Sequence, residues 1–320
     1  MKDHAPDKDD IIDAAARIKP HVHRTPVLTC SAIDKMVGAK VFFKCENFQK
    51  VGAFKARGAT NAVLNYDPYE IKLGVATHSS GNHAAALSRA AAIKQVPAYI
   101  VMPENSSSAK IAAVKTYGGK IVFCKPTLAA REEKLDELVY ETGAIEIHPY
   151  NNYNIIAGQA TAALELLQEI PKLHTLFVPV GGGGLASGTA LAVSYFSPTT
   201  KVIAAEPTGA DDAYQSFYKR KLVPQENPDT IADGLRTSLG SLTYPIIKRL
   251  VHDVVTVTDQ ATIEAMKMVW ERMKIVIEPS SAVALAALIK HKQKYAGVNV
   301  GIILSGGNVD LMELPWMVKR

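Results

Sequence analysis

The amino-acid sequence predicts an α/β protein with two open, twisted, mainly parallel sheets, and three observations support this prediction. Short apolar runs alternate with helix-like segments from residue 40 onward, which is the β-α-β order of a parallel sheet. The alternation comes in two series, one ending near residue 142 and one beginning near residue 176. The 320 residues, 48% of them apolar, are enough for two well-filled cores.

The N-terminal segment contains a helix followed by an extended stretch. Residues 9–19 have charged and apolar residues at helical spacing, and Asp9 or Asp10 is the expected N-cap. Pro26 excludes a helix over residues 23–28, because proline restricts the backbone and lacks an amide proton.

The two series of strands define the expected domains. The first series has strands at 41–43, 74–77, 98–102 and 120–124, with helices at 56–64, 82–93, 109–117 and 129–142. The second series has strands at 176–180, 202–206 and 300–304. We expect residues 65–147 to form a small domain inserted into a large one made of residues 1–64 and 148–320.

Charge and composition exclude several classes of protein. The net charge of +5 is mild and the basic residues are scattered, so no nucleic-acid stripe is expected. Slight basicity suits anionic ligands such as a phosphate group or an acidic substrate. Residues 175–200 carry no charge, but Pro179 and four consecutive glycines favour a buried strand-turn-helix over a membrane span.

The cysteines and the N-terminus predict a cytoplasmic protein. Cys30, Cys45 and Cys124 are odd in number, far apart and in no metal-ligand spacing, which is typical of reduced thiols. Residues 1–4 are polar and lead into no apolar run, so no signal peptide is expected.

Residues 46–59 are the strongest candidate for covalent chemistry. Lys55 lies where a loop becomes a helix, and partial desolvation there would lower the pKa of its amine and favour attack on a carbonyl. The alternative is that the basic residues around it are solvated surface charges, as most charged residues are. These residues are Lys44, Lys50, Lys55 and Arg57.

The segment ENFQKVGAFKARGA (residues 46–59) resembles the cofactor segment of pyridoxal-phosphate enzymes of the threonine dehydratase and serine racemase group. The resemblance spans roughly residues 20–312 and is closest to animal-type serine racemases. It implies a fold-type II enzyme with the cofactor in the cleft between the domains. It also implies that Lys55 carries the cofactor as an imine beside Phe54, and that the protein is a homodimer.

The loop HSSGNH (residues 78–83) joins a predicted strand to a helix and offers hydroxyl and amide groups to a carboxylate. The alternative is an ordinary helix cap. The loop is similar to the substrate loop of serine racemases, where the position of Ser80 faces the lysine across the substrate and that of Asn82 lies beside the cofactor ring oxygen. The substrate-binding residues expected here are Ser79, Ser80, Gly81, Asn82 and His83.

The glycine loop after the strand at 176–180 predicts a phosphate site, because its free amides open a helix. Its members are Gly181, Gly182, Gly183 and Gly184. Gly181-x-Gly183-x-x-Ala186 with Glu206 at the end of the next strand also fits a dinucleotide fingerprint. The loop resembles the cofactor-phosphate loop of the racemases, and Lys55 favours that interpretation, since a hydride enzyme does not need a lysine imine.

Two further sites follow from the resemblance. Ser305, directly after the last strand, is expected to hydrogen-bond the pyridine nitrogen without protonating it, which makes the ring a weaker electron sink.

The acidic turn at residues 206–213 offers carboxylates and carbonyls that suit a hard cation, although it could be a solvated turn. The family places Mg²⁺, or Mn²⁺ or Ca²⁺, on the positions of Glu206, Asp212 and the carbonyl of Ala210.

A nucleotide effector, ATP or AMP, is a further expectation from the resemblance. Cys30 and Ala85 depart from the serine and glutamine that contact ATP in animal-type enzymes. The expected nucleotide-binding residues are Lys50, Tyr117, Lys274 and Asn308.

The predicted substrate depends on the run of Ser106, Ser107 and Ser108. The run is either a helix cap or the feature of the aspartate racemase branch, in which three hydroxyls bind a second carboxylate. Arg131 and Arg236 are candidate cationic helpers. We favour aspartate, with serine as a further substrate.

The predicted mechanism is a two-base racemisation in which Lys55 removes the α-proton from one face and Ser80 returns a proton to the other. Serine racemase, or a dehydratase of serine or 3-hydroxyaspartate, is the alternative, because a β-hydroxyl can leave from the same carbanion. A non-catalytic nucleotide-binding domain is supported by the glycine loop and Glu206 alone.

Overall fold

The computed structural model describes residues 4–317. The expectation that residues 1–4 belong to no signal peptide therefore falls mostly outside the described residues, as do the outermost residues of the predicted large domain. Within residues 4–317, no helix has both the length and the apolar character needed to cross a bilayer.

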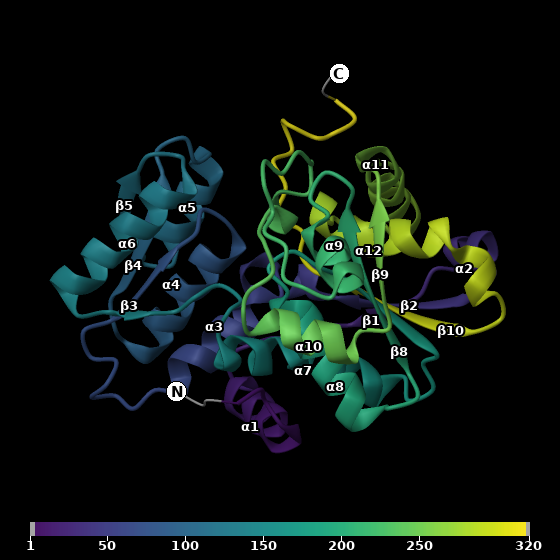
Figure 1. The fold of residues 1–320 in the computed structure, drawn as a ribbon, viewed down its shortest axis with the longest axis horizontal. Coiled ribbons are helices and arrows are strands. Elements are labelled where there is room, and N and C mark those ends of the chain that lie inside the picture. The colour runs from purple at the N-terminus through teal and green to yellow at the C-terminus, as the bar shows by residue number, and fades with distance from the viewer. Residues whose placement is uncertain (1–3, 318–320) are drawn as a thin grey trace.

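Two separate sheets form the molecule, and the predicted α/β class is confirmed (Figure 1). The larger sheet has the order β1-β2-β10-β7-β8-β9, and the smaller has the order β5-β4-β3-β6. All pairings are parallel except that of β1 with β2. The strands are β1 (Val27–Leu28), β2 (Lys40–Cys45), β3 (Val75–His78), β4 (Ala98–Pro103), β5 (Lys120–Cys124), β6 (Ile145–Glu146), β7 (Thr175–Pro179), β8 (Lys201–Pro207), β9 (Asp253–Val257) and β10 (Asn299–Leu304).

Helices cover the sheets and connect their strands. The α-helices are α1 (Lys8–Ile18), α2 (Ser31–Val37), α3 (Lys55–Leu64), α4 (Asn82–Lys94), α5 (Ser108–Thr116), α6 (Leu128–Thr142), α7 (Tyr153–Glu169), α8 (Gly184–Phe196), α9 (Asp212–Lys219), α10 (Thr243–Leu250), α11 (Asp259–Met268) and α12 (Pro279–Lys290). The short helical segments are η1 (Glu46–Phe48), η2 (Lys50–Gly52), η3 (Asp233–Leu235), η4 (Val269–Met273) and η5 (Lys292–Tyr295). In Figure 1, α4, α5 and α6 surround the small sheet at one end of the molecule. The domain limits at residues 65 and 147 stay a prediction.

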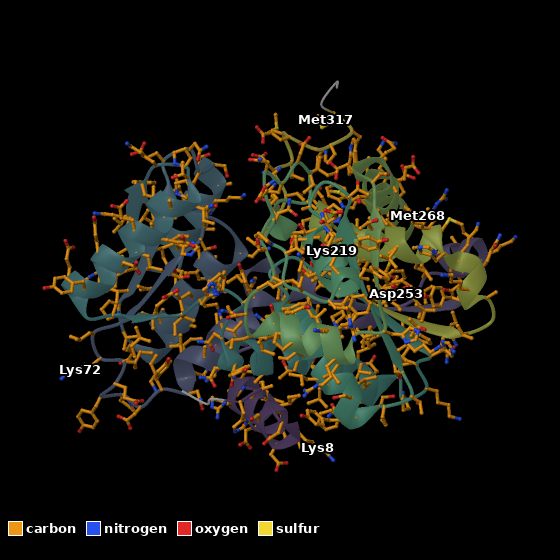
Figure 2. The ribbon with its side chains drawn as sticks, in the orientation of Figure 1. Lys8, Lys72, Lys219, Asp253, Met268 and Met317 are labelled. Atoms are coloured by element: carbon orange, nitrogen blue, oxygen red, sulfur yellow. The ribbon has the colours of Figure 1, made fainter. Side chains whose placement is uncertain are left out.

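Buried apolar strands build the core of the large sheet. Every residue of β7 is buried, as are all residues but the first of β2 and of β8. Strands with both faces covered read as continuous apolar runs, which is why the sequence revealed them. Charged side chains lie around the periphery, for example Lys8 on α1 and Lys72 near the small sheet (Figure 2).

The predicted N-cap of the first helix is wrong. Asp7 caps α1 by accepting a hydrogen bond from the amide of Asp10, and the Asp10 carboxylate accepts one from the amide of Asp7. Asp10 is therefore the partner of the cap, and Asp9 lies in the first turn.

Three strands were not predicted as strands, although β1 lies in the stretch that was expected to be extended. Two of them, β1 and β6, have only two residues each, and β9 has two half-buried positions, so none presents a long apolar run. The other predicted elements are present, with ends that differ by a residue or two.

Parallel pairing brings the candidate loops to common edges. In the large sheet Leu304 pairs with Cys45 and Pro179 with Ala205, so the segments after these strands leave the same edge. In the small sheet His78 pairs with Val101, which brings the loops after β3 and β4 together.

Candidate active site

Lys55 is the first residue of α3, and its amine lies in a desolvated position. The Nζ atom donates a hydrogen bond to the carbonyl of Pro149 at 2.8 Å. Burial lowers the pKa of Lys55 to about 8, and the nearby Glu278 carboxylate opposes this shift. At neutral pH a much larger fraction of the Lys55 amine is therefore in the reactive, uncharged form than in a solvated lysine.

The alternative interpretation, that the basic residues around Lys55 are solvated surface charges, is wrong for two of its neighbours. Lys44 and Arg57 are fully buried, at 0% exposure, whereas Lys50 is exposed. Lys44 and Arg57 are held by ion pairs with glutamates, which explains how two cations are tolerated in the interior.

Ser305 lies directly against the Lys55 segment. The amide of Phe54 donates to the carbonyl of Ser305 at 2.9 Å, and Ala53 forms an isolated bridge with Gly306. The Ser305 hydroxyl is 3.1 Å from the hydroxyl of Ser281 on α12. The end of β10 and the start of α3 thus present Ser305, Phe54 and Lys55 together.

The glycine loop has no room for side chains, because a tyrosine packs on it. A Cβ atom on Gly182 would lie 2.3 Å from the ring of Tyr150, and one on Gly184 would lie 3.0 Å from the Tyr150 Cβ. Gly183 has a φ of +89°, which a side chain would strain. Tyr150 follows Pro149, the acceptor of Lys55, so this short segment links the loop to the amine.

The dinucleotide interpretation of this loop is disfavoured by the position of Glu206. The two Glu206 oxygens accept hydrogen bonds from the amides of Ala213 and Tyr214, at 3.2 and 2.5 Å, and the residue is fully buried. A carboxylate that binds a ribose must instead be presented to the ligand.

Asn82 at the start of α4 connects the small sheet to the large one. Its Nδ2 atom donates to both oxygens of Glu278, each at 3.1 Å, and its Oδ1 atom accepts from Asn308 at 2.8 Å. Burial, followed by the charge of Asp233, raises the pKa of Glu278 to about 7. Glu278 was not predicted as a site residue, although it directly precedes Pro279, the first residue of α12.

The serine loop before α4 is partly buried, and His83, which follows it on α4, lies near Lys55. Ser79 Oγ accepts from the amide of Gly81 at 3.4 Å, and Ser80 is half-buried. The His83 ring contacts the carbonyl of Ile147 at 3.0 Å. Burial, and next the charge of Lys55, lower the pKa of His83.

A second histidine near the amine was missed in the sequence. Burial, and next the charges of His78 and Lys55, lower the pKa of His148 to about 4. Its Nδ1 atom accepts hydrogen bonds from the amides of Tyr150 and Asn151, at 3.3 and 2.9 Å. His148 follows the two-residue strand β6, which no pattern in the sequence had indicated.

The predicted substrate serines have local partners. Ser106 Oγ donates to the carbonyl of Pro103 at 2.7 Å, and Ser107 caps α5 by accepting from the amide of Lys110 at 3.5 Å. This geometry is that of a helix cap, the alternative considered for the run. Ser108 is the first residue of α5.

The two candidate arginines lie in different places. The charge of Arg131, on α6, contributes to lowering the pKa of His78, so it lies near the end of β3. Arg236 follows η3, is exposed, and donates to the carbonyl of Thr230. Within the described residues, no hydrogen bond joins Arg236 to the serine run or to Lys55.

The predicted cation site contains two buried carboxylates. Asp212 is 1% exposed, and its Oδ1 atom is buried without a hydrogen-bond partner. Burial raises the pKa of Asp212 to about 7, and burial followed by the charge of Asp212 raises that of Glu206. An unpartnered buried oxygen beside a second carboxylate suits a divalent cation, and the buried Ala210 lies between them in the sequence.

The predicted nucleotide residues are distributed over four segments. Asn308 donates to the carbonyl of Val51 at 2.7 Å, which brings it beside Lys50. Lys274, after η4, is exposed, and Tyr117, after α5, is half-buried. Among the described residues, no hydrogen bond joins the last two to the others.

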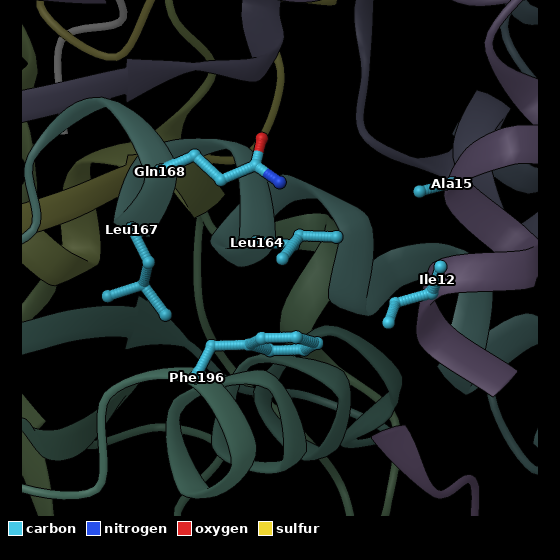
Figure 3. A pocket seen from close by; sticks show the side chains of 6 residues that line it. All are labelled: Ile12, Ala15, Leu164, Leu167, Gln168 and Phe196. Carbon is cyan, nitrogen blue, oxygen red and sulfur yellow. The ribbon is translucent and has the colours of Figure 1, made fainter. Parts of the chain in front are cut away.

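An apolar groove elsewhere on the molecule has no chemical groups for catalysis (Figure 3). It lies between α1, α7 and α8, and none of its lining residues is a predicted site residue. The lining residues are Ile12, Ala15, Leu164, Leu167, Gln168 and Phe196.

Comparisons with known proteins show the family to which the chain belongs. The family described as pyridoxal-phosphate dependent enzyme matches residues 18–306. A beta-hydroxyaspartate dehydratase of Paracoccus denitrificans (strain Pd 1222) is 47% identical over 313 residues, which are 98% of this chain and 99% of that protein. The solved structure of maize serine racemase is 48% identical, with a TM-score of 0.95 and coverage of 98% of this chain and 97% of that one. A pyridoxal 5'-phosphate-dependent aspartate racemase structure is 38% identical, with a TM-score of 0.92 and coverage of 99% and 100%. The chain therefore belongs to the family of pyridoxal-phosphate dependent enzymes.

Proposed function

We propose that this protein removes the α-proton of a β-hydroxy-α-amino acid, serine or 3-hydroxyaspartate, and that dehydration and racemisation follow from this step. The observation that carries the proposal is the desolvated Lys55 amine, with a pKa of about 8, beside the glycine loop and Ser305. The near-full-length similarity to a beta-hydroxyaspartate dehydratase and to a serine racemase supports this substrate class.

The residues fit pyridoxal phosphate. The loop from Gly181 to Gly184 has the bare backbone and the helix start that a phosphate requires, since a Cβ on Gly182 would collide with Tyr150. Lys55 supplies the amine and Ser305 a neutral hydroxyl for the ring nitrogen. When bound, the cofactor withdraws electrons from the substrate Cα and makes its proton removable.

Two residues of the chain would move the protons. Lys55, with its lowered pKa, takes the α-proton from one face, and the Ser80 hydroxyl donates a proton to the other face, which inverts the centre. If the β-hydroxyl leaves with a proton as water instead, the product hydrolyses to a keto acid and ammonia. The amides and hydroxyls of residues 79–83 would hold the substrate carboxylate at the start of α4.

Aspartate racemisation, which sequence analysis favoured, becomes the second candidate. The solved aspartate racemase, at 38% identity, is less similar than the dehydratase at 47% and the serine racemase at 48%. The serine run on which the aspartate prediction depended also makes the contacts of a helix cap. The proximity of Arg131 to the end of β3 still offers a cation for a second carboxylate.

The test is a comparison of four substrates with the holoenzyme and Mg²⁺. L-serine, L-threo- and L-erythro-3-hydroxyaspartate, and L-aspartate are incubated separately, with chiral chromatography for D-amino acids and an assay for pyruvate or oxaloacetate. We expect keto acid from a hydroxylated substrate at a rate at least about tenfold above D-aspartate formation. Rapid D-aspartate formation without keto acid from any of the three hydroxylated substrates would contradict the proposal and support the second candidate.

We further propose a Mg²⁺-type cation on Glu206, Asp212 and the Ala210 carbonyl, a homodimer, and regulation by ATP or AMP. EDTA is expected to lower the melting temperature of the wild type by about 2–4 °C, because the carboxylates then repel each other in the interior. Asp212→Asn should lose this response, whereas Asp211→Asn, the matched neighbour, should keep it. A wild type that is insensitive to EDTA and to added Mg²⁺ in differential scanning calorimetry would refute the cation site.

A further inference from the structure

Four charged side chains are buried together beneath the start of α3, and the proposed chemistry uses none of them. Lys44, Glu46 and Arg57 are 0% exposed, and Glu165 on α7 is 15% exposed. With two cations and two anions, the group has no net charge when all four side chains are ionised. We call these four residues the buried charge network.

Arg57 is the centre of the network and is held on two sides. Its Nε and Nη2 atoms donate to the two oxygens of Glu46 at 2.7 and 2.9 Å. Its Nη1 and Nη2 atoms donate to the two oxygens of Glu165, both at 2.8 Å. Lys44 Nζ donates to Glu165 at 2.6 Å. Paired hydrogen bonds of this kind fix the plane of a guanidinium group as well as its position.

Neutral groups satisfy the remaining polar atoms of the network. The Thr25 hydroxyl donates to Glu46 at 2.6 Å, and the Thr25 carbonyl accepts from Lys44 at 2.7 Å. The Thr161 hydroxyl accepts from Arg57 at 3.2 Å. The network is thus fully connected, which makes it rigid.

The network joins the two helices that determine the surroundings of the Lys55 amine. Lys55 begins α3, and its acceptor Pro149 lies just before α7. Arg57 is in the first turn of α3, and Glu165 is on α7. The two helices also cross closely, since a Cβ atom on Gly158 would lie 2.6 Å from the Cα of Gly58. A shift between the helices would therefore move the amine relative to its acceptor.

Stability alone gives a weak reason for such a network. The cost of removing two ion pairs from water often equals or exceeds their attraction, and apolar side chains of similar volume are frequently as stabilising. Paired ionic contacts do fix one geometry, whereas apolar contacts tolerate small shifts. We propose that the buried charge network positions the Lys55 amine by locking α3 against α7. Its members are positioning residues, because the reacting atoms belong to Lys55.

The pKa of the Lys55 amine provides a readout, because a purely structural role of the buried charge network would leave that pKa unchanged. The groups that face the amine are Glu278 before α12, His83 on α4 and His148 before α7. None of them belongs to the network, so replacing network residues leaves these charges in place. If α3 shifts, water reaches the amine, desolvation weakens, and the pKa of Lys55 rises from about 8 toward its ordinary value.

The experiment compares Arg57→Lys, which keeps the charge but loses the paired contacts, and Glu165→Gln, which keeps the shape but loses the charge. Glu137→Gln, from the exposed ion pair with Lys134 on α6, is the matched control. Each full-length chain is freed of cofactor with hydroxylamine and then dialysed, and its rate of covalent pyridoxal phosphate capture is measured by absorbance from about pH 6 to pH 10. Turnover and thermal unfolding are measured on the reloaded enzymes. This proposal rests on the role proposed for Lys55, and the capture assay needs no substrate.

We expect both network variants to unfold cooperatively, to shift the pH midpoint of capture upward, and to lose about 10- to 100-fold in kcat, with Glu137→Gln unchanged. A folded Arg57→Lys with the wild-type midpoint and kcat would overturn the proposal. Failure of both variants to fold would also overturn it, because the network would then serve the fold and not the amine. Failure of wild-type Lys55 to capture the cofactor would instead refute the proposed function.

Discussion

Replacement of Lys55 by alanine is expected to lower turnover by at least about a thousandfold and to prevent covalent attachment of pyridoxal phosphate. The reason is that Lys55 would serve both as the covalent anchor and as one of the two bases. The measurement is the absorbance of the dialysed protein, followed by borohydride reduction and mass spectrometry of the peptide that contains residue 55. Steady-state keto-acid formation from the preferred substrate gives the turnover.

Lys72→Ala is the control for this experiment, since Lys72 is exposed and is not one of the predicted site residues. It should retain both cofactor and turnover. Wild-type turnover in Lys55→Ala would contradict the proposed chemistry. Loss of turnover with covalent cofactor still attached would identify a different lysine as the anchor.

Replacement of Ser80 by alanine is expected to lower racemisation about 10²- to 10⁴-fold in both directions, because inversion needs a proton donor on each face. Keto-acid formation from the enantiomer whose proton Lys55 removes should fall much less. The measurement is the ratio of D-amino acid to keto acid formed from each enantiomer of the same substrate.

The two reactions of one Ser80→Ala preparation serve as their own control, because misfolding or loss of cofactor would lower both equally. Equal loss of racemisation and elimination would contradict the role proposed for Ser80 in proton transfer. Unchanged racemisation would assign the second base to another group, and the histidines near Lys55, His83 and His148, would then be examined first.

Local sequence patterns were sufficient to predict the fold class, the glycine loop and the role of Lys55. Strands such as β7 and β8 are buried on both faces, so their apolar runs stand out without any knowledge of their neighbours. The glycine loop and Lys55 were recognised because the chemistry of phosphate binding and covalent attachment requires particular residues in short stretches. The strands β6 and β9 were missed because one is two residues long and the other lacks a clean apolar run.

Substrate preference was the weakest prediction, since it depended on one exposed serine run. Ser106 and Ser107 contact their own loop and helix, which a sequence motif does not distinguish from contacts to a ligand. Hydroxyl groups serve equally well as caps and as carboxylate partners.

The α/β class, the lysine at the start of a helix and the glycine loop could be predicted without coordinates, since each follows from the pattern of short stretches of the chain. The groups that surround these elements were known only once the chain was seen folded. Asn82 and Glu278 are 196 residues apart in the chain, and Arg57 and Glu165 are 108 apart, yet both pairs are hydrogen-bonded. The physical reason is that burial and long-range contacts set the pKa values and the positions of charged groups, and neither is encoded in a local pattern.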